Sequence, residues 1–183
     1  MPPRPVLVLT GPPAVGKSTT ARAVATARQR CAYVDVDDIR LLVVAGGAAP
    51  WDGDEGRRQQ DLGVRNACAL ASGFVTADIE VVVADVLTRE TLPLYRELLP
   101  GCVVVRLTVP LEEARRRAAT RQVWLTDEEF GALHRADAAA HLAADHTLDV
   151  RDLTPQQQSA VVDQLWARGP RNSSATSGLP PAR

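Results

Sequence analysis

Residues 11–19 read Gly11-Pro12-Pro13-Ala14-Val15-Gly16-Lys17-Ser18-Thr19, and this stretch decides the fold. It matches the pattern G-x-x-x-x-G-K-[ST], a glycine-rich loop whose backbone N–H groups surround phosphate oxygens. Lys17 is the single lysine of the chain, against twenty arginines. Where every other fixed cation is a planar guanidinium, a lone compact ammonium marks a position that must fit among phosphate oxygens. We therefore expect these residues to bind the phosphates of a nucleotide.

The segments on either side of this loop have the required secondary structure. The apolar run 5–10 predicts a buried parallel strand, and 18–28 predicts a helix. The positive end of that helix dipole would face the β-phosphate, with Lys17 reaching the β- and γ-phosphates and Ser18 binding Mg²⁺. The alternative is an ordinary glycine-containing turn between strand and helix that binds no ligand. The full spacing and the isolated lysine favour nucleotide binding.

Length and composition bound the class of protein. The chain has 183 residues, 45% of them hydrophobic and 23% charged, which suits one α/β domain. Its formal net charge of −1 gives no general attraction to nucleic acid or to an anionic membrane. Cys31, Cys68 and Cys102 form no C-x-x-C pair, so neither a disulfide framework nor a zinc site is indicated. Because no apolar run approaches the ~20 residues of a membrane span, we expect a cytoplasmic protein without a membrane partner.

Short apolar runs of strand length alternate with helical patterns along the chain. Repeated βα units of this kind favour an α/β fold, a parallel, right-handed, three-layer α/β/α sandwich. We expect one domain over 1–168, and a disordered tail over 169–183, which is rich in Ser, Gly and Pro. A polar, glycine-rich segment opens at Asp37, includes 46–47 and 50–56, and predicts a mobile substrate loop. The strands are predicted at 5–10, 32–36, 79–84, 102–109 and 146–150, and the helices at 18–28, 58–74, 88–99, 111–120, 126–144 and 154–167.

A group of carboxylates follows the second predicted strand. Ligands of open α/β sheets bind beyond the carboxyl ends of the strands, so Asp35, Asp37 and Asp38 should face the same crevice as the phosphate loop. Alternation along the strand would turn Asp35 and Asp37 one way and Asp38 the other. Phosphoryl transfer needs a carboxylate that accepts or orients the proton of the attacking hydroxyl, and Asp37 is the candidate. The alternative is that Asp37 or Asp38 caps the next helix.

The glycine loop 11–19, followed some twenty residues later by Val36-Asp37-Asp38-Ile39-Arg40, resembles a known family. It is similar to the small P-loop kinases, a group that includes chloramphenicol phosphotransferase, polynucleotide 5′-kinase, gluconate kinase and shikimate kinase. The resemblance implies dependence on ATP and Mg²⁺ and a five-stranded sheet of order 2-3-1-4-5. In the first two of these kinases the aspartate that matches Asp37 is the catalytic base. The resemblance does not identify the acceptor.

Asp85 ends the third predicted strand, in Val81-Val-Val-Ala-Asp85. This arrangement resembles a Walker B strand, whose carboxylate holds Mg²⁺ directly or through water. In the kinase group a carboxylate at this position can instead contact the acceptor. The remaining alternative is an ordinary loop or capping carboxylate. We expect Asp85 to be a site residue, with metal binding as its first candidate role.

Arginines after the fourth predicted strand resemble the start of a kinase lid, over about 115–130. Arg117 and Arg121 are spaced i, i+4, so they share one helical face and could close over the phosphoryl group. The alternative is a solvated basic face paired with Glu112 and Glu113. By analogy with related kinases, residues 148–153 would wrap the adenine ring.

Histidines and tryptophans give weaker signals. His134, Asp137 and His141 fall near one helical face, which favours an ordinary helix surface over a metal site. Trp51 and Trp124 either cover an organic acceptor or pack locally.

These observations favour a kinase that moves the γ-phosphoryl group of ATP to a hydroxyl of a small antibiotic- or metabolite-type molecule. A polynucleotide 5′-hydroxyl kinase is the alternative enzyme, although the acidic net charge argues against a nucleic acid partner. A non-catalytic ATP-binding regulatory or resistance protein is the alternative of another class. The sequence does not determine the oligomeric state.

Overall fold

A five-stranded parallel sheet organises this computed structural model, which describes residues 5–119 and 125–170. The order across the sheet is β2-β3-β1-β4-β5, and every neighbouring pair is parallel. The predicted α/β class and the 2-3-1-4-5 order are thereby confirmed. The strands are β1 (Leu7–Thr10), β2 (Cys31–Asp35), β3 (Glu80–Ala84), β4 (Val103–Thr108) and β5 (His146–Asp149).

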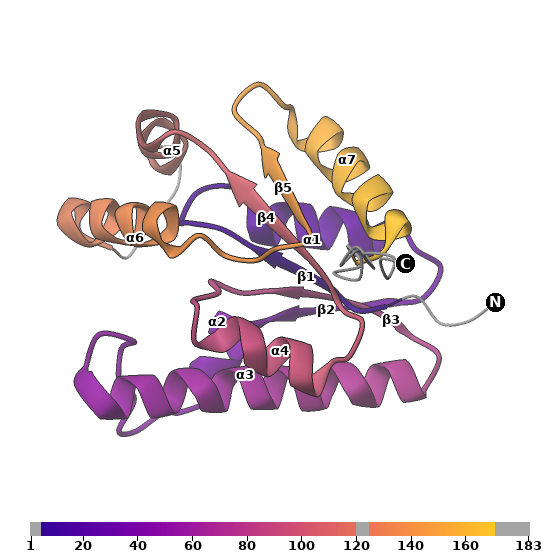
Figure 1. The fold of residues 1–183 in the computed structure, drawn as a ribbon, viewed down its shortest axis with the longest axis horizontal. Coiled ribbons are helices and arrows are strands. Elements are labelled where there is room, and N and C mark those ends of the chain that lie inside the picture. Colours follow the sequence, from indigo (N-terminus) through magenta and orange to yellow (C-terminus); the bar gives the residue numbers. More distant parts are fainter. Residues whose placement is uncertain (1–4, 120–124, 171–183) are drawn as a thin grey trace, which may run out of the picture.

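Helices cover both faces of the sheet, as Figure 1 shows. One face is covered by α1 (Lys17–Thr26) and α7 (Pro155–Arg168), and the other by α2 (Val36–Arg40), α3 (Gly53–Thr76) and α4 (Thr91–Leu98). The last pair, α5 (Leu111–Ala118) and α6 (Asp127–Ala140), lies together at one end of the molecule. A small apolar cluster of Ala14, Ala114 and Phe130 joins this pair to the glycine loop.

Alternating strand residues supply two separate cores. Val8 and Val83 pack toward α3 and α4, whereas Leu9 and Val82 pack toward α1 and α7. Because both faces are covered, the central strands are apolar at nearly every position, as the sequence indicated. The polar groups that follow the strands are therefore confined to the carboxyl edge of the sheet.

Two helices differ from the sequence-based expectation. Residues 36–40 form α2 where a loop was predicted, because the Asp35 side chain caps the helix by accepting from the Asp37 backbone N–H at 3.2 Å. The long α3 begins at Gly53, so the last residues of the predicted mobile loop, 53–56, are helical. The connection before α3 passes close to this helix at Gly56. A Cβ on Gly56 would lie 2.0 Å from the Ala49 carbonyl oxygen, so only glycine permits this approach.

Some predictions fall outside the described residues. Arg121 and Trp124 lie in the undescribed segment between α5 and α6, and most of the predicted tail lies in 171–183. The single domain over 1–168 and the lid over 115–130 stay predictions. The residues Thr126-Asp-Glu-Glu129 form a capping box at the start of α6, with the Thr126 hydroxyl accepting from the Glu129 N–H at 3.2 Å. None of the described helices has the length and apolar composition needed to cross a bilayer.

Candidate active site

The glycine loop takes its shape from two residues. Gly11 has φ +141°, and a Cβ on it would lie 2.3 Å from the Leu107 carbonyl oxygen, so only glycine fits there. Gly16 has φ +94° and occupies the N-cap of α1 without a side-chain hydrogen bond to the helix. The first N–H groups of α1 therefore keep the capacity to bind an anion.

Lys17 begins α1 and turns its ammonium back into the loop. Nζ donates to the carbonyl oxygens of Gly11 at 2.8 Å and Pro12 at 3.0 Å. Burial lowers the pKa of Lys17 to about 8, although nearby carboxylates, of which Asp37 acts most strongly, raise it. The ammonium is thus incompletely neutralised, and phosphate oxygens would supply the missing negative charge.

Ser18 contacts a carboxylate that sequence reasoning did not assign to the metal. Its hydroxyl donates to Asp35 Oδ2 at 3.1 Å, and the Tyr33 hydroxyl donates to the same oxygen. Among the described residues, no group of three or more His, Cys, Asp or Glu could hold a metal alone. Mg²⁺ needs no such group, because it binds one or two protein oxygens and completes its shell with phosphate and water. The Ser18 and Asp35 oxygens fit that requirement, and the signal for Asp35 was its place at the strand end.

Asp37 lies in the first turn of α2 and not on a strand. The expected alternation of Asp35 and Asp37 is therefore wrong, and so is the capping alternative for Asp37 and Asp38, because Asp35 is the cap. The Asp37 side chain is 73% exposed and accepts from Arg40 Nη1 at 2.8 Å. It is thus accessible to a second molecule while one of its oxygens is held by a guanidinium. Its role as catalytic base stays a prediction.

Asp85 is turned into the protein and its side chain is 0% exposed. One oxygen accepts from Arg40 Nη2 at 2.9 Å, and the other from the Tyr95 hydroxyl at 2.9 Å. Burial raises the pKa of Asp85, whereas Arg40 and Tyr95 lower it. The carboxylate therefore anchors Arg40, which in turn holds Asp37. Metal binding by Asp85 stays a prediction, and the part played by Tyr95 had no signal in the sequence.

A hollow of about 350 Å³ lies beside the glycine loop. Arg117 reaches it from α5, with Nε donating to Glu113 at 2.8 Å and Nη2 to the Val150 carbonyl at 2.8 Å. The lining combines residues of the glycine loop and α1 with Leu153, which ends the segment that the sequence analogy expected to wrap the adenine ring, and with two residues of α7. Contact between Arg117 and the transferring phosphoryl group stays a prediction. The lining residues are Ala14, Gly16, Thr19, Thr20, Arg117, Leu153, Pro155 and Gln158.

His134 and Asp137 lie in the protein interior, contrary to the expected helix surface. His134 Nε2 lies 3.0 Å from the Pro13 carbonyl oxygen, and burial lowers the pKa of the imidazole. The neutral ring can therefore donate Nε2–H to the glycine loop. Asp137 pairs with Arg106 of β4 at 2.6 Å, and both side chains are largely buried. These contacts tie α6 to the loop and the sheet, and a helical wheel alone did not distinguish them from surface residues.

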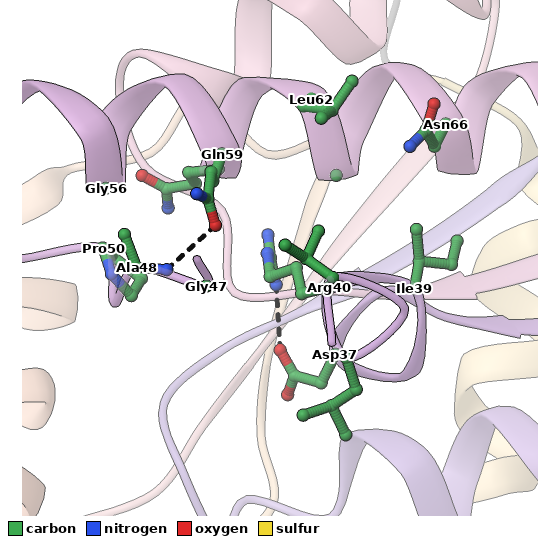
Figure 2. A pocket seen from close by; sticks show the side chains of 14 residues that line it. Asp37, Ile39, Arg40, Gly47, Ala48, Pro50, Gly56, Gln59, Leu62 and Asn66 are labelled. Atoms are coloured by element: carbon green, nitrogen blue, oxygen red, sulfur yellow. Dashed lines mark hydrogen bonds and ion pairs between the residues drawn. The ribbon is translucent and has the colours of Figure 1, made fainter. Parts of the chain in front are cut away.

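A second hollow, of about 400 Å³, lies between α2, the connection 41–52 and the first half of α3. Asp37 and Arg40 stand at one side of it, as Figure 2 shows. Gln59 closes the connection by accepting from the Ala48 N–H at 2.9 Å and donating to the Gly46 carbonyl at 2.8 Å. The predicted base therefore faces a cavity of the size of small-molecule sites.

Comparison with known proteins gives a family and several relatives. A family model described as an AAA domain matches residues 6–143. A shikimate kinase from Corynebacterium glutamicum is 32% identical over 173 residues, covering 86% of this chain and 94% of that protein.

Solved structures repeat the fold at lower identity. A sugar kinase from Janibacter sp. HTCC2649 has a TM-score of 0.70 at 19% identity, covering 91% of this chain and 95% of the other. A tunicamycin resistance protein from Deinococcus radiodurans has a TM-score of 0.65 at 17% identity, covering 90% and 95%. At such identities the likeness shows the fold alone.

Proposed function

This chain belongs to the AAA-domain family, among the small P-loop kinases, and we propose that it transfers the γ-phosphoryl group of ATP to a hydroxyl of a small molecule. One observation carries the proposal. The Ser18 hydroxyl of the glycine loop donates to Asp35 at 3.1 Å, and Asp35 also accepts from the Asp37 N–H at 3.2 Å, so the loop and the predicted base lie beside each other. A protein that only binds a nucleotide has no use for a carboxylate in that position.

In this proposal the glycine loop binds the nucleotide and the metal ion. Lys17 and the loop N–H groups bind the nucleotide phosphates, and His134 holds the loop from α6 through the Pro13 carbonyl. Ser18 and Asp35 would hold Mg²⁺, with Asp85 as the further candidate that the sequence suggests. The ion would neutralise charge on the phosphate oxygens. ATP dependence also suits the cytoplasmic location expected from the sequence.

Asp37 would accept the proton of the acceptor hydroxyl. The hydroxyl oxygen forms its bond to the γ-phosphorus while the bond from that phosphorus to the bridging β,γ-oxygen breaks, and ADP leaves with that oxygen. Arg40 fixes the direction of the Asp37 carboxylate at 2.8 Å. Arg117, or Arg121 in the undescribed segment, would neutralise charge on the transferring group.

The names of the relatives bear on the class of the acceptor. The relatives are named for shikimate, for sugars and for resistance to tunicamycin, which supports a metabolite or an antibiotic. The arrangement Asp37-Asp38-Ile39-Arg40, which resembles that of polynucleotide 5′-kinase, favours a polynucleotide 5′-hydroxyl as the second candidate. The net charge of −1 opposes it.

An ADP-release screen tests the proposal. The chain is incubated with ATP and Mg²⁺ and with hydroxylated antibiotics, sugars, hydroxy acids, nucleosides and 5′-hydroxyl oligonucleotides. We expect acceptor-dependent ADP from at least one small molecule, lost in Asp37→Asn. Release with oligonucleotides only would favour the second candidate. ATP binding without acceptor-dependent ADP from any class would favour a regulatory or resistance protein.

A further inference from the structure

The hollow that Asp37 lines, here called the acceptor cavity, contains one ion pair among otherwise neutral side chains. Its walls come from α2, the connection 41–52 and α3, and its volume is about 400 Å³. Figure 2 shows Asp37 and Arg40 facing each other across their ion pair, with α3 passing along the opposite side. The only charged residues among the described lining residues are this pair. Whether the cavity attracts a charged acceptor therefore depends on this ion pair and on the charged groups that contact it.

That charge is not positive. The Arg40 guanidinium donates to Asp37 at 2.8 Å and to the fully buried Asp85 at 2.9 Å. Two carboxylates thus share one guanidinium, and the Arg40 pKa is raised by them against the effect of burial. A carboxylate or phosphate entering the cavity would lose water and find, among the described lining residues, no cation that is not already paired with a carboxylate.

Other arginines nearby do not change this balance. Arg57 and Arg58 of α3 pair with Asp54 at the start of the same helix and with Glu55, and neither arginine lines the cavity. Both side chains are mostly exposed. Because they are exposed, these pairs are screened by water.

Apolar side chains form most of the remaining wall. Leu41 is 74% exposed and Leu62 is 47% exposed, and both line the cavity with Ile39 and Val43. Large exposed apolar residues gathered around a hollow indicate a surface that a ligand covers. Polar contacts come from neutral groups, since the side-chain amides of Gln60 and Asn66 also line the cavity.

We propose that this cavity binds an uncharged hydroxyl compound that carries an aromatic ring or an apolar chain, and that it selects against carboxylates and phosphate esters. The proposal rests on the proposed function, because it names the acceptor class of the same transfer. The apolar wall contacts the ring or chain, the amides bind further polar groups, and the hydroxyl lies at Asp37. The C. glutamicum shikimate kinase, by contrast, is named for an acceptor that carries a carboxylate.

Three small probes separate charge from apolar contact. 1-Phenyl-1,2-ethanediol is neutral and has a ring, mandelate replaces its CH₂OH by a carboxylate, and ethylene glycol lacks the ring. Dissociation constants are measured on the full chain by thermal-shift titration in the presence of ADP. We expect the diol to bind at least tenfold more tightly than either comparison compound. Equal or tighter binding of mandelate, or no detectable binding of the diol, would overturn the proposal.

Two variants of one helix locate the binding. Leu62 and Leu70 of α3 are 47% and 48% exposed, but only Leu62 lines this cavity. Leu62→Glu should weaken diol binding at least tenfold, whereas Leu70→Glu should leave it unchanged. Because both side chains are exposed, both variants should fold. An equal effect of the two substitutions, or none from Leu62→Glu, would place the diol elsewhere and overturn the proposal.

ADP release separates this proposal from the kinase activity on which it rests. Selective binding of the diol with no ADP release from any neutral acceptor would support the cavity chemistry and count against phosphoryl transfer. Transfer to hydroxy acids or phosphate esters in preference to neutral acceptors would support the kinase and overturn the acceptor class. Lys17→Ala supplies the background rate in each measurement.

Discussion

Two cations of the site, Lys17 in the phosphate loop and Arg40 in α2, are held in opposite ways. Lys17 donates to two carbonyl oxygens, and burial lowers its pKa to about 8. Arg40 donates to the carboxylates of Asp37 and Asp85, which raise its pKa against burial. The positive charge of Lys17 is therefore available to an anion, whereas that of Arg40 is already neutralised.

This contrast separates a phosphate half from an acceptor half. The phosphate loop is contiguous in sequence and, as proposed, would bind phosphate chiefly through backbone N–H groups and one ammonium. The acceptor half depends on side chains far apart in sequence, since Arg40 and Asp85 are 45 positions apart. We therefore expect nucleotide binding in the first half to depend on the single charge of Lys17. Activity in the second half should depend on the geometry of the hydrogen-bond network around Arg40 and Asp85.

The largest expected effect comes from Lys17→Ala. It should reduce phosphoryl transfer to background and weaken ATP binding while the fold remains intact, because the ammonium serves the ligand and contributes little to the core. Turnover, nucleotide affinity and circular dichroism measure these three outcomes. An unfolded variant would contradict the assignment of Lys17 to the phosphate half.

Lys17→Arg is the control for charge. A guanidinium keeps the positive charge but not the compact shape, so it should not restore turnover. Near-normal turnover in this variant would show that charge alone suffices, and would remove the geometric reason for the single lysine.

A smaller effect is expected in the acceptor half from Asp37→Asn. The amide can accept a hydrogen bond but cannot take the hydroxyl proton, so kcat should fall by about 10²–10⁴ with the ATP dissociation constant nearly unchanged. The melting temperature should also hold, because the exposed pair with Arg40 contributes little to stability. Asp38→Asn is the neighbouring control and should keep its activity. Retention of most turnover by Asp37→Asn would end the case for Asp37 as base.

Asp85→Asn tests whether the buried Asp85 carboxylate serves to hold Arg40 and Tyr95 or to bind Mg²⁺. Removing one partner of a buried pair costs about 3 kcal/mol, so the free energy of unfolding should fall by that order. Tyr95→Phe removes one hydrogen bond from the same carboxylate and should cost about 1 kcal/mol. Urea unfolding measures both. Unchanged stability together with a raised Mg²⁺ requirement in Asp85→Asn would instead support Asp85 as a metal ligand.

The fold could be predicted because its signals are local. Buried strands, βα repeats and the glycine loop each occupy a short stretch, and the capping box at Thr126 appears where its residue pattern indicated. The strand order came from the resemblance to small P-loop kinases and is confirmed by the sheet.

The acceptor half could be predicted only in part. The cluster from Asp35 to Arg40 marked the region, but a strand period was assumed where Asp35 caps a helix, and this changes the direction of Asp37. The contacts of Asp85 with Arg40 and Tyr95 depend on the packing of α2 and α4 beside β3, which one sequence does not reveal. Burial of His134 is a similar case.

The smallest expected effect is the dependence of ATP binding on pH. Phosphate favours the charged ammonium, so the pKa of Lys17 in the complex should lie above its value of about 8 in the free protein. Below pH 8 Lys17 is already protonated, and affinity should be nearly constant. Above pH 8 binding must take up a proton, so affinity should fall, by about tenfold between pH 7 and 9. Arg40 gives no such slope, because its guanidinium does not titrate in this range.

Nucleotide titrations at fixed ionic strength, with free Mg²⁺ held constant, measure the slope. Lys17→Ala should bind weakly and show no decline with this midpoint, which assigns the decline to the ammonium. Melting temperatures at each pH distinguish weaker binding from loss of structure. A constant affinity of the unmodified chain up to pH 9 would mean that the Lys17 ammonium is neutralised as fully as the Arg40 guanidinium, and the contrast between the two halves would then rest on geometry alone.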